Sequence, residues 1–143
     1  MKIKQEQAED LLQELDFSRG LVTAVVRDWR TKEILMVAHQ NREAVLKTLT
    51  TGLMHYWSRS RNKLWLKGES SGHFQRVKRV FLDCDGDALI YDVQQKTAAC
   101  HMGYYSCFFR KLEKNRWKIF RKKKFEPEEV YASANSLNVS GKV

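Results

Sequence analysis

Three cysteines are the residues of this sequence with the most distinctive chemistry. Cys84 stands in an acidic segment, and Cys100 and Cys107 enclose a short segment that begins with His101. Three thiolates and an imidazole suit Zn²⁺, and three protein ligands leave a fourth position for water, as a catalytic site requires. Spacing alone leaves a second reading open, in which the thiols are buried and inert. No C-x-x-C pair occurs, so a zinc ribbon and the nucleobase deaminase motif are both excluded.

An acidic cluster surrounds the first of these cysteines. Asp83, Asp85 and Asp87 alternate with Cys84 and a glycine. In an extended strand the three carboxylates would share one face and the thiol would point to the other. Carboxylates so close together raise one another's pKa unless a cation neutralises them, and their hard oxygens suit Mg²⁺ or Ca²⁺. The alternative is an ordinary acidic turn with solvated side chains.

A third segment has the composition of a phosphate-binding loop. It spans residues 65–72, contains Lys67 and ends in Ser70-Ser71-Gly72, and Arg59 precedes it. Backbone N–H groups and cations brought together in this way surround a phosphate, although a hairpin loop explains the pattern equally well. Neither the P-loop nor the dinucleotide fingerprint is matched.

The four histidines differ in what their neighbours predict. His101 follows a candidate metal ligand, and an imidazole suits proton transfer near neutral pH. His73 directly follows Ser70-Ser71-Gly72, where it could contact a substrate. His39 and His55 fall in or beside apolar strands, so packing or hydrogen bonding is their expected role.

The elements that must position these residues are short. Apolar periodicity predicts a helix over residues 6–15, and an Asn41 cap and a Gly52 stop predict another between them. Alternating apolar residues and turn signals predict strands over residues 21–27, 34–38, 53–58, 64–67, 75–83, 88–94 and 105–112. A short helix is expected over residues 127–134. We therefore expect an α+β fold with a mostly antiparallel β-sheet and two or three short helices.

Length and composition indicate one domain over residues 1–143. A chain of 143 residues with 43% hydrophobic content can form a core. Within it we distinguish an N-terminal helical segment, residues 1–18, and a basic C-terminal extension, residues 111–143. No apolar stretch approaches the length of a membrane span, and the amino terminus lacks the features of a signal peptide, so we expect a cytoplasmic protein.

The net charge of +9 indicates an anionic ligand without identifying it. A zinc-stabilised nucleic-acid-binding protein is one class that it allows, because residues 110–124 interleave cations with Trp117 and Phe120. A strand with one solvated face is the simpler interpretation of that stretch. A thiol redox protein would need a C-x-x-C pair or a nearby resolving cysteine.

Taken together, four motifs point to one family. Their order and spacing resemble the phosphoribosyl-AMP cyclohydrolase family over residues 20–110. The motifs are Ser-Arg-Ser-Arg at 58–61, Leu-Trp-Leu-Lys-Gly-Glu-Ser-Ser-Gly at 64–72, Asp-Cys-Asp-Gly-Asp at 83–87, and Ala-Cys-His to Ser-Cys-Phe at 99–108.

The resemblance implies a reaction and an assembly. Family members use water to open the adenine ring of phosphoribosyl-AMP between N1 and C6, the third step of histidine biosynthesis. They are homodimers with the active site at the subunit interface, where cysteines of both chains hold zinc. The implied Zn²⁺ ligands are Cys84, Cys100 and Cys107. The implied Mg²⁺ ligands are Asp83, Asp85 and Asp87.

Roles for the other motif residues follow from the same resemblance. His101 is the candidate for proton transfer. The expected substrate contacts are Arg59, Trp65, Lys67, Ser70, Ser71, Gly72 and His73, with no membrane and no specific nucleic acid as partner. Five positions depart from the family pattern: Met102 stands where Thr is usual, Tyr104 and Tyr105 where basic residues are common, and Thr97 and Ala98 where Gly-Pro is common. The tail after Arg110 is too short for the pyrophosphatase domain fused in some relatives, which implies a stand-alone enzyme.

Overall fold

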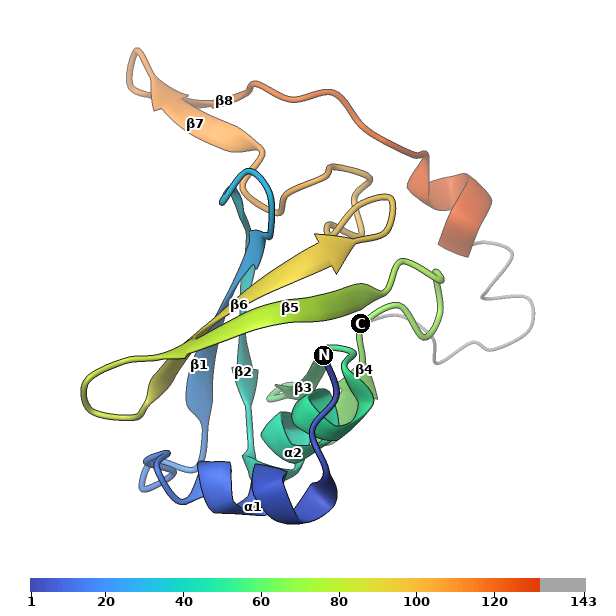
Figure 1. Ribbon diagram of the computed structural model, residues 1–143. Coiled ribbons are helices and arrows are strands. Elements are labelled where there is room, and N and C mark those ends of the chain that lie inside the picture. The colour runs from blue at the N-terminus through green and yellow to red at the C-terminus, as the bar shows by residue number, and fades with distance from the viewer. Residues whose placement is uncertain (132–143) are drawn as a thin grey trace.

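The computed structural model describes residues 1–131, and a four-stranded sheet organises them (Figure 1). Its strand order is β2-β1-β6-β5, with β1–β2 and β5–β6 antiparallel and β1–β6 parallel. The predicted α+β fold with mostly antiparallel pairing is therefore confirmed. The strands are β1 (Val22–Asp28), β2 (Ile34–Gln40), β5 (Gln75–Leu82) and β6 (Ala88–Gln95).

Alternation of apolar residues explains why one face of β1 is buried in the core. Val22, Ala24 and Val26 are buried, whereas the residues between them are only partly covered. Side chains of a strand point alternately to its two faces, so these three enter one core. Residues 29–33, which we call the β1–β2 loop, connect β1 to β2.

Two helices, α1 (Gln5–Leu12) and α2 (Arg42–Thr51), pack against each other. The predicted signals of α2 are confirmed: the Asn41 side chain accepts a hydrogen bond of 2.9 Å from the Ala44 N–H, and Gly52 ends the helix with φ +76°. The predicted helix over residues 6–15 is too long. It ends at Leu12 because the next N–H groups bond three residues back, as in a tightened last turn. None of the helices in the described part of the chain is long and apolar enough to cross a membrane.

A second sheet consists of β3 (His55–Ser58) and β4 (Lys63–Leu66). Tyr56 and Trp65 face each other across it, with ring centroids 4.9 Å apart, and both belong to the main core. This hairpin leads directly into the Ser-Gly loop, residues 67–74.

The last hairpin, β7 (Arg110–Glu113) and β8 (Arg116–Ile119), projects from the body (Figure 1). The predicted strand over residues 105–112 is wrong in its first half, because residues 96–109 form an irregular loop, which we call the cysteine loop. There the Ser106 hydroxyl and the Cys107 N–H bond to β2 carbonyls instead of continuing a ladder. A helical segment follows at residues 127–131, and the rest of its predicted range lies outside the described residues.

Candidate metal-binding active site

The two candidate metal centres lie at opposite ends of β6. The acidic turn, residues 83–87, precedes this strand, and the cysteine loop follows it. A strand of eight residues is about 25 Å long. Cys84 is therefore remote from Cys100 and Cys107 within one chain, and the structure does not bring the three thiols together.

Backbone hydrogen bonds shape the acidic turn. Asp83 Oδ1 accepts from the Asp87 and Ala88 N–H groups at 3.1 and 3.3 Å. Gly86, with φ +76°, has no room for a side chain, since a Cβ would lie 2.6 Å from the Glu14 carbonyl oxygen. The strand alternation expected for these carboxylates is wrong, because β5 ends at Leu82 and a turn gathers them.

The carboxylates of the acidic turn lie within 4.8 Å of one another and interact strongly. The hydrogen bond between Asp85 and Asp87, together with the charge of Asp85, raises the pKa of Asp87. Desolvation acts to raise the pKa of Asp83, but the hydrogen bonds that Asp83 accepts from the Ala88 and Asp87 N–H groups and shares with the Asp85 and Asp87 side chains outweigh it and lower that pKa. The expected rise therefore holds for Asp87 and is wrong for Asp83. Their hard oxygens fit Mg²⁺ chemically.

The cysteine loop closes on itself through two backbone hydrogen bonds. The Ala99 N–H donates to the Tyr105 carbonyl at 3.0 Å, and the Cys100 N–H donates to the Tyr104 carbonyl at 3.1 Å. This closure brings the buried Cys100 and the exposed Cys107 into side-chain contact. Two neighbouring thiols are suitable Zn²⁺ ligands, so this end of the molecule fits the metal by its donor chemistry.

The thiol pair shares its protons unequally. The hydrogen bond between the two sulfurs lowers the pKa of Cys100 to about 6 and raises the pKa of Cys107. Lys67 follows β4 as the first residue of the Ser-Gly loop. Its ammonium reaches the cysteine loop and donates to the Ala99 carbonyl at 2.5 Å. Burial lowers the pKa of Lys67, while both cysteines act to raise it. An ammonium beside the pair favours its thiolate form.

The Ser-Gly loop lies next to the cysteine loop. Tyr131 hydrogen-bonds to Ser71, and the His73 ring meets Phe125 edge-on with centroids 4.8 Å apart. His73 is buried and its Nδ1 has no hydrogen-bond partner within the described residues. Burial, followed by the charges of Lys67 and Lys96, lowers the pKa of His73. The C-terminal segment that covers both loops carried no sequence signal for this role.

The remaining predicted site residues take different places. Arg59 and His101 are exposed, whereas Trp65 is part of the core. His55 Nδ1 contacts the Leu53 carbonyl at 2.8 Å, in agreement with a hydrogen-bonding role. His39 is half-buried, and burial lowers its pKa, with a smaller contribution from Arg59.

Comparison with known proteins decides the family. The family model described as phosphoribosyl-AMP cyclohydrolase matches residues 36–109, which include every proposed cysteine and aspartate ligand. The chain belongs to the phosphoribosyl-AMP cyclohydrolase family. It is similar to the phosphoribosyl-AMP cyclohydrolase of Methanothermobacter thermautotrophicus, at 57% identity over 78% of this chain and 82% of the relative. The Methanosarcina barkeri enzyme of that name is 53% identical over 83% and 90% of the two chains.

A bifunctional relative also matches. The histidine biosynthesis bifunctional protein of Thermoanaerobacter pseudethanolicus is 48% identical over 90% of this chain but only 60% of its own length. Membership of the phosphoribosyl-AMP cyclohydrolase family makes the chain an enzyme of histidine biosynthesis. Between the two classes that charge left open, it favours the hydrolase over the nucleic-acid-binding protein.

Proposed function

We propose that this chain opens the adenine ring of phosphoribosyl-AMP at the N1–C6 bond with Zn²⁺ and Mg²⁺. The observation that carries this proposal is the contact between Cys100 and Cys107, beside His101 and Lys67, in a chain of this family. When bound, Zn²⁺ acts as a Lewis acid that makes hydroxide available near neutral pH.

His101 is the proposed proton carrier. It is exposed and adjacent to Cys100, so it can meet both a ligand of the metal and a substrate arriving from solvent. It accepts the proton of the attacking water and returns it to N1 as the C6–N1 bond breaks. A positioned acid–base group of this kind contributes about 10²–10⁴-fold in rate.

The substrate phosphates meet the cations and hydroxyls of the Ser-Gly loop in this proposal. Arg59 supplies a charged donor, and Ser70 and Ser71 supply hydroxyl groups. The Gly72 N–H donates to the Gly68 carbonyl at 2.7 Å, so Gly72 shapes the loop without donating to the phosphate. Lys67 adds its charge while it holds the Ala99 carbonyl. Asp83, Asp85 and Asp87 would hold Mg²⁺, whose charge would offset that of the phosphates.

A homodimer completes the zinc site. One chain places Cys84 about 25 Å from the thiol pair, so we assign the third ligand to the acidic turn of a second copy. The β7–β8 hairpin offers a surface on which the second copy can pack. Leu112 and Trp117 are opposite each other on one of its faces, and their side chains are 63% and 69% exposed. Apolar exposure of this size on a two-stranded hairpin is typical of a surface that a partner covers.

The direct test is an activity assay with metal control. Purified protein is incubated with phosphoribosyl-AMP, the ultraviolet change on ring opening is followed, and the assay is repeated after chelation and after zinc is restored. We expect turnover that is lost with zinc and recovered with it. Turnover that persists in verified zinc-free protein contradicts the metal role. No turnover in folded protein carrying zinc and magnesium contradicts the proposed reaction, and nucleic-acid affinity that falls steeply with salt would then support the other class.

A further inference from the structure

We propose that Tyr105 and Asp28 form a positioning pair that orients the cysteine loop for zinc. This inference rests on the proposed function and adds two residues that are neither ligands nor substrate contacts. The Tyr105 hydroxyl donates to Asp28 Oδ2 at the end of β1, 77 residues away in the chain. Tyr105 also closes the loop, because its carbonyl accepts from the Ala99 N–H. The phenol thus connects the turn that joins the two thiols to the main sheet.

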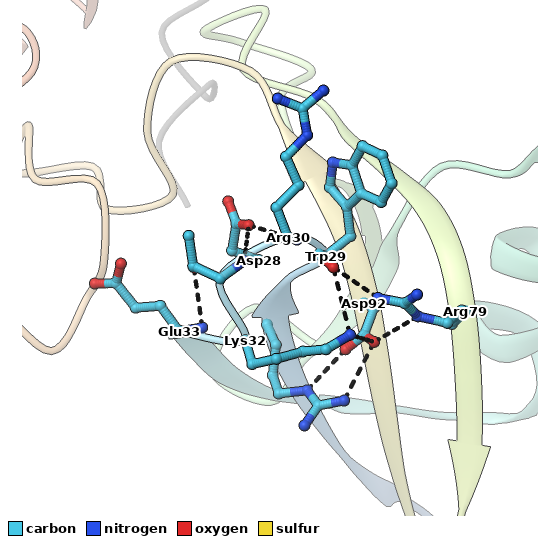
Figure 2. A network of polar contacts seen from close by, with 9 residues as sticks. Asp28, Trp29, Arg30, Lys32, Glu33, Arg79 and Asp92 are labelled. Carbon is cyan, nitrogen blue, oxygen red and sulfur yellow. Dashed lines mark hydrogen bonds and ion pairs between the residues drawn. The ribbon is translucent and has the colours of Figure 1, made fainter.

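The Asp28 carboxylate is held by its own turn as well as by the phenol. Its other oxygen, Oδ1, accepts from the N–H groups of Arg30 and Thr31 at 2.8 and 2.9 Å (Figure 2). These bonds hold the carboxylate against its own turn, so it cannot rotate to follow a moving partner. The hydrogen bonds of Asp28 outweigh the burial that acts to raise its pKa and leave that pKa low.

The β1–β2 loop is itself anchored to the sheet. Asp92 on β6 is fully buried and accepts from Lys32 of the loop at 3.0 Å and from Arg79 on β5 at 2.9 Å. The Arg79 guanidinium continues to the Trp29 carbonyl at 2.6 Å, so one side chain connects the carboxylate with the loop backbone (Figure 2). Tyr105 therefore bonds to a rigid part of the fold.

Other contacts hold the cysteine loop from two further directions. The Ser106 hydroxyl donates to the Ile34 carbonyl at 2.7 Å, and the Cys107 N–H donates to the Leu35 carbonyl at 2.7 Å. Lys67 holds the Ala99 carbonyl from the opposite side. Groups that orient metal ligands in this way change metal affinity when they are removed, although they never touch the ion. The hydroxyl of Tyr105 is engaged here, which assigns it a role other than phosphate contact.

The test compares zinc-loaded Tyr105→Phe, Asp28→Asn and the double variant with the wild type. Tyr104→Phe is the matched control, since its ring stacks on Phe109 at 3.9 Å and phenylalanine keeps that stacking. Zinc release is followed with a chromogenic chelator, and the cobalt-substituted proteins are compared by their thiolate charge-transfer absorption. We expect Tyr105→Phe to release zinc about tenfold faster, to alter the cobalt spectrum and to lower kcat with KM unchanged. The double variant should be no worse than the more affected single variant, because both remove one interaction.

Each outcome separates this inference from the proposed function. Release rates and cobalt spectra equal to those of the wild type in Tyr105→Phe, or equal effects in Tyr104→Phe, overturn the positioning pair alone. A wild type that binds no zinc overturns the proposed function as well. If Tyr105→Phe does not fold, the decision falls to Asp28→Asn, which keeps an oxygen for the turn N–H groups and replaces the charged acceptor of the phenol with a neutral amide. An unchanged zinc release rate in that folded variant overturns the pair.

Discussion

The two ends of β6 hold their chemical groups in opposite ways. At the acidic turn, neighbours in the chain hold the carboxylates: Asp83 accepts from Asp87 and Ala88, and the side chains remain largely in solvent. Only the backbone of this turn reaches distant residues, since the Gly86 and Asp87 carbonyls accept from the N–H groups of Asp16 and Thr23. At the cysteine loop, the partners come from β1, β2 and the start of the Ser-Gly loop, between 32 and 77 residues away. The carboxylates of one site are therefore oriented by a local turn that distant backbone bonds attach to the body, whereas the thiols of the other come together only when the main sheet has formed.

The largest effect on activity should come from substituting the cysteines at the two ends of β6, first in pure proteins and then in different subunits of one dimer. Cys84→Ser and Cys107→Ser should each lose zinc and nearly all activity as pure proteins. Mixed dimers of the two variants contain one site whose three thiols are intact if Cys84 acts across the interface. Random subunit exchange should then restore about a quarter of wild-type activity, because half of the dimers are mixed and each has one intact site. Activity and zinc content after exchange are the measurements.

The matched mixture is Cys100→Ser with Cys107→Ser. These residues belong to the same loop of one chain, so every site in the mixed dimer lacks a ligand and no activity should return. Failure of the first mixture to recover, with dimers shown to exchange, would contradict an intersubunit site.

The next largest effect concerns Asp92, the buried carboxylate that anchors the β1–β2 loop to the sheet. Asp92→Asn leaves the cations of Arg27, Lys32 and Arg79 without their carboxylate. Removing one member of a buried ionic network costs about 3 kcal/mol in the free energy of unfolding, which chemical denaturation at neutral pH measures. Lys111→Ala is the surface control, since its ion pair with Glu113 is exposed and should leave that free energy almost unchanged.

Acid should weaken the ion pairs of Asp92, because protonation removes its charge. Burial acts to raise the pKa of Asp92, but hydrogen bonds from Arg27, Lys32 and Arg79 outweigh it and lower the pKa to about 2. A carboxyl with a lowered folded-state pKa stabilises the fold above its unfolded pKa of 3.8 and loses this contribution as pH falls toward 2. Stability should therefore fall by about 2 kcal/mol between pH 5 and pH 1 from this group. Denaturation of the wild type and Asp92→Asn across pH should show the difference shrinking in acid.

The smallest effect on stability should come from the acidic turn. Asp85→Asn removes the carboxyl whose hydrogen bond and charge raise the pKa of Asp87, so the Asp87 pKa should move down toward its usual range. The thermal midpoint of metal-free protein should stay unchanged because the side chains are exposed and the turn keeps its backbone bonds, whereas magnesium affinity should fall. Carboxyl titration by NMR and magnesium calorimetry check these outcomes. A large loss of stability would show that the Asp85 side chain itself holds the turn, in addition to the backbone bonds from Asp16 and Thr23.

The same contrast explains how much the sequence could predict. The Asn41 cap, the Gly52 stop and the acidic cluster depend on residues within a few positions of each other, and each was found where expected. The irregular path of residues 105–109 could not be foreseen, because strand-like composition was overridden by hydrogen bonds to β2. Asp28 and Asp92 carried no signal either, since nothing local connects them with Tyr105 or with three distant cations.

The parallel pairing of β1 with β6 has a consequence for folding. Fifty-nine residues, 29–87, separate these neighbouring strands, so β1 cannot complete its pairing until β6 has emerged and the intervening chain has closed. Contacts of such sequence separation form slowly. The cysteine loop follows β6 and docks on the β1–β2 hairpin, so its thiols come together only after this slow step. A nascent chain therefore presents its cysteines singly, and only a chain whose central sheet is complete offers the paired thiols.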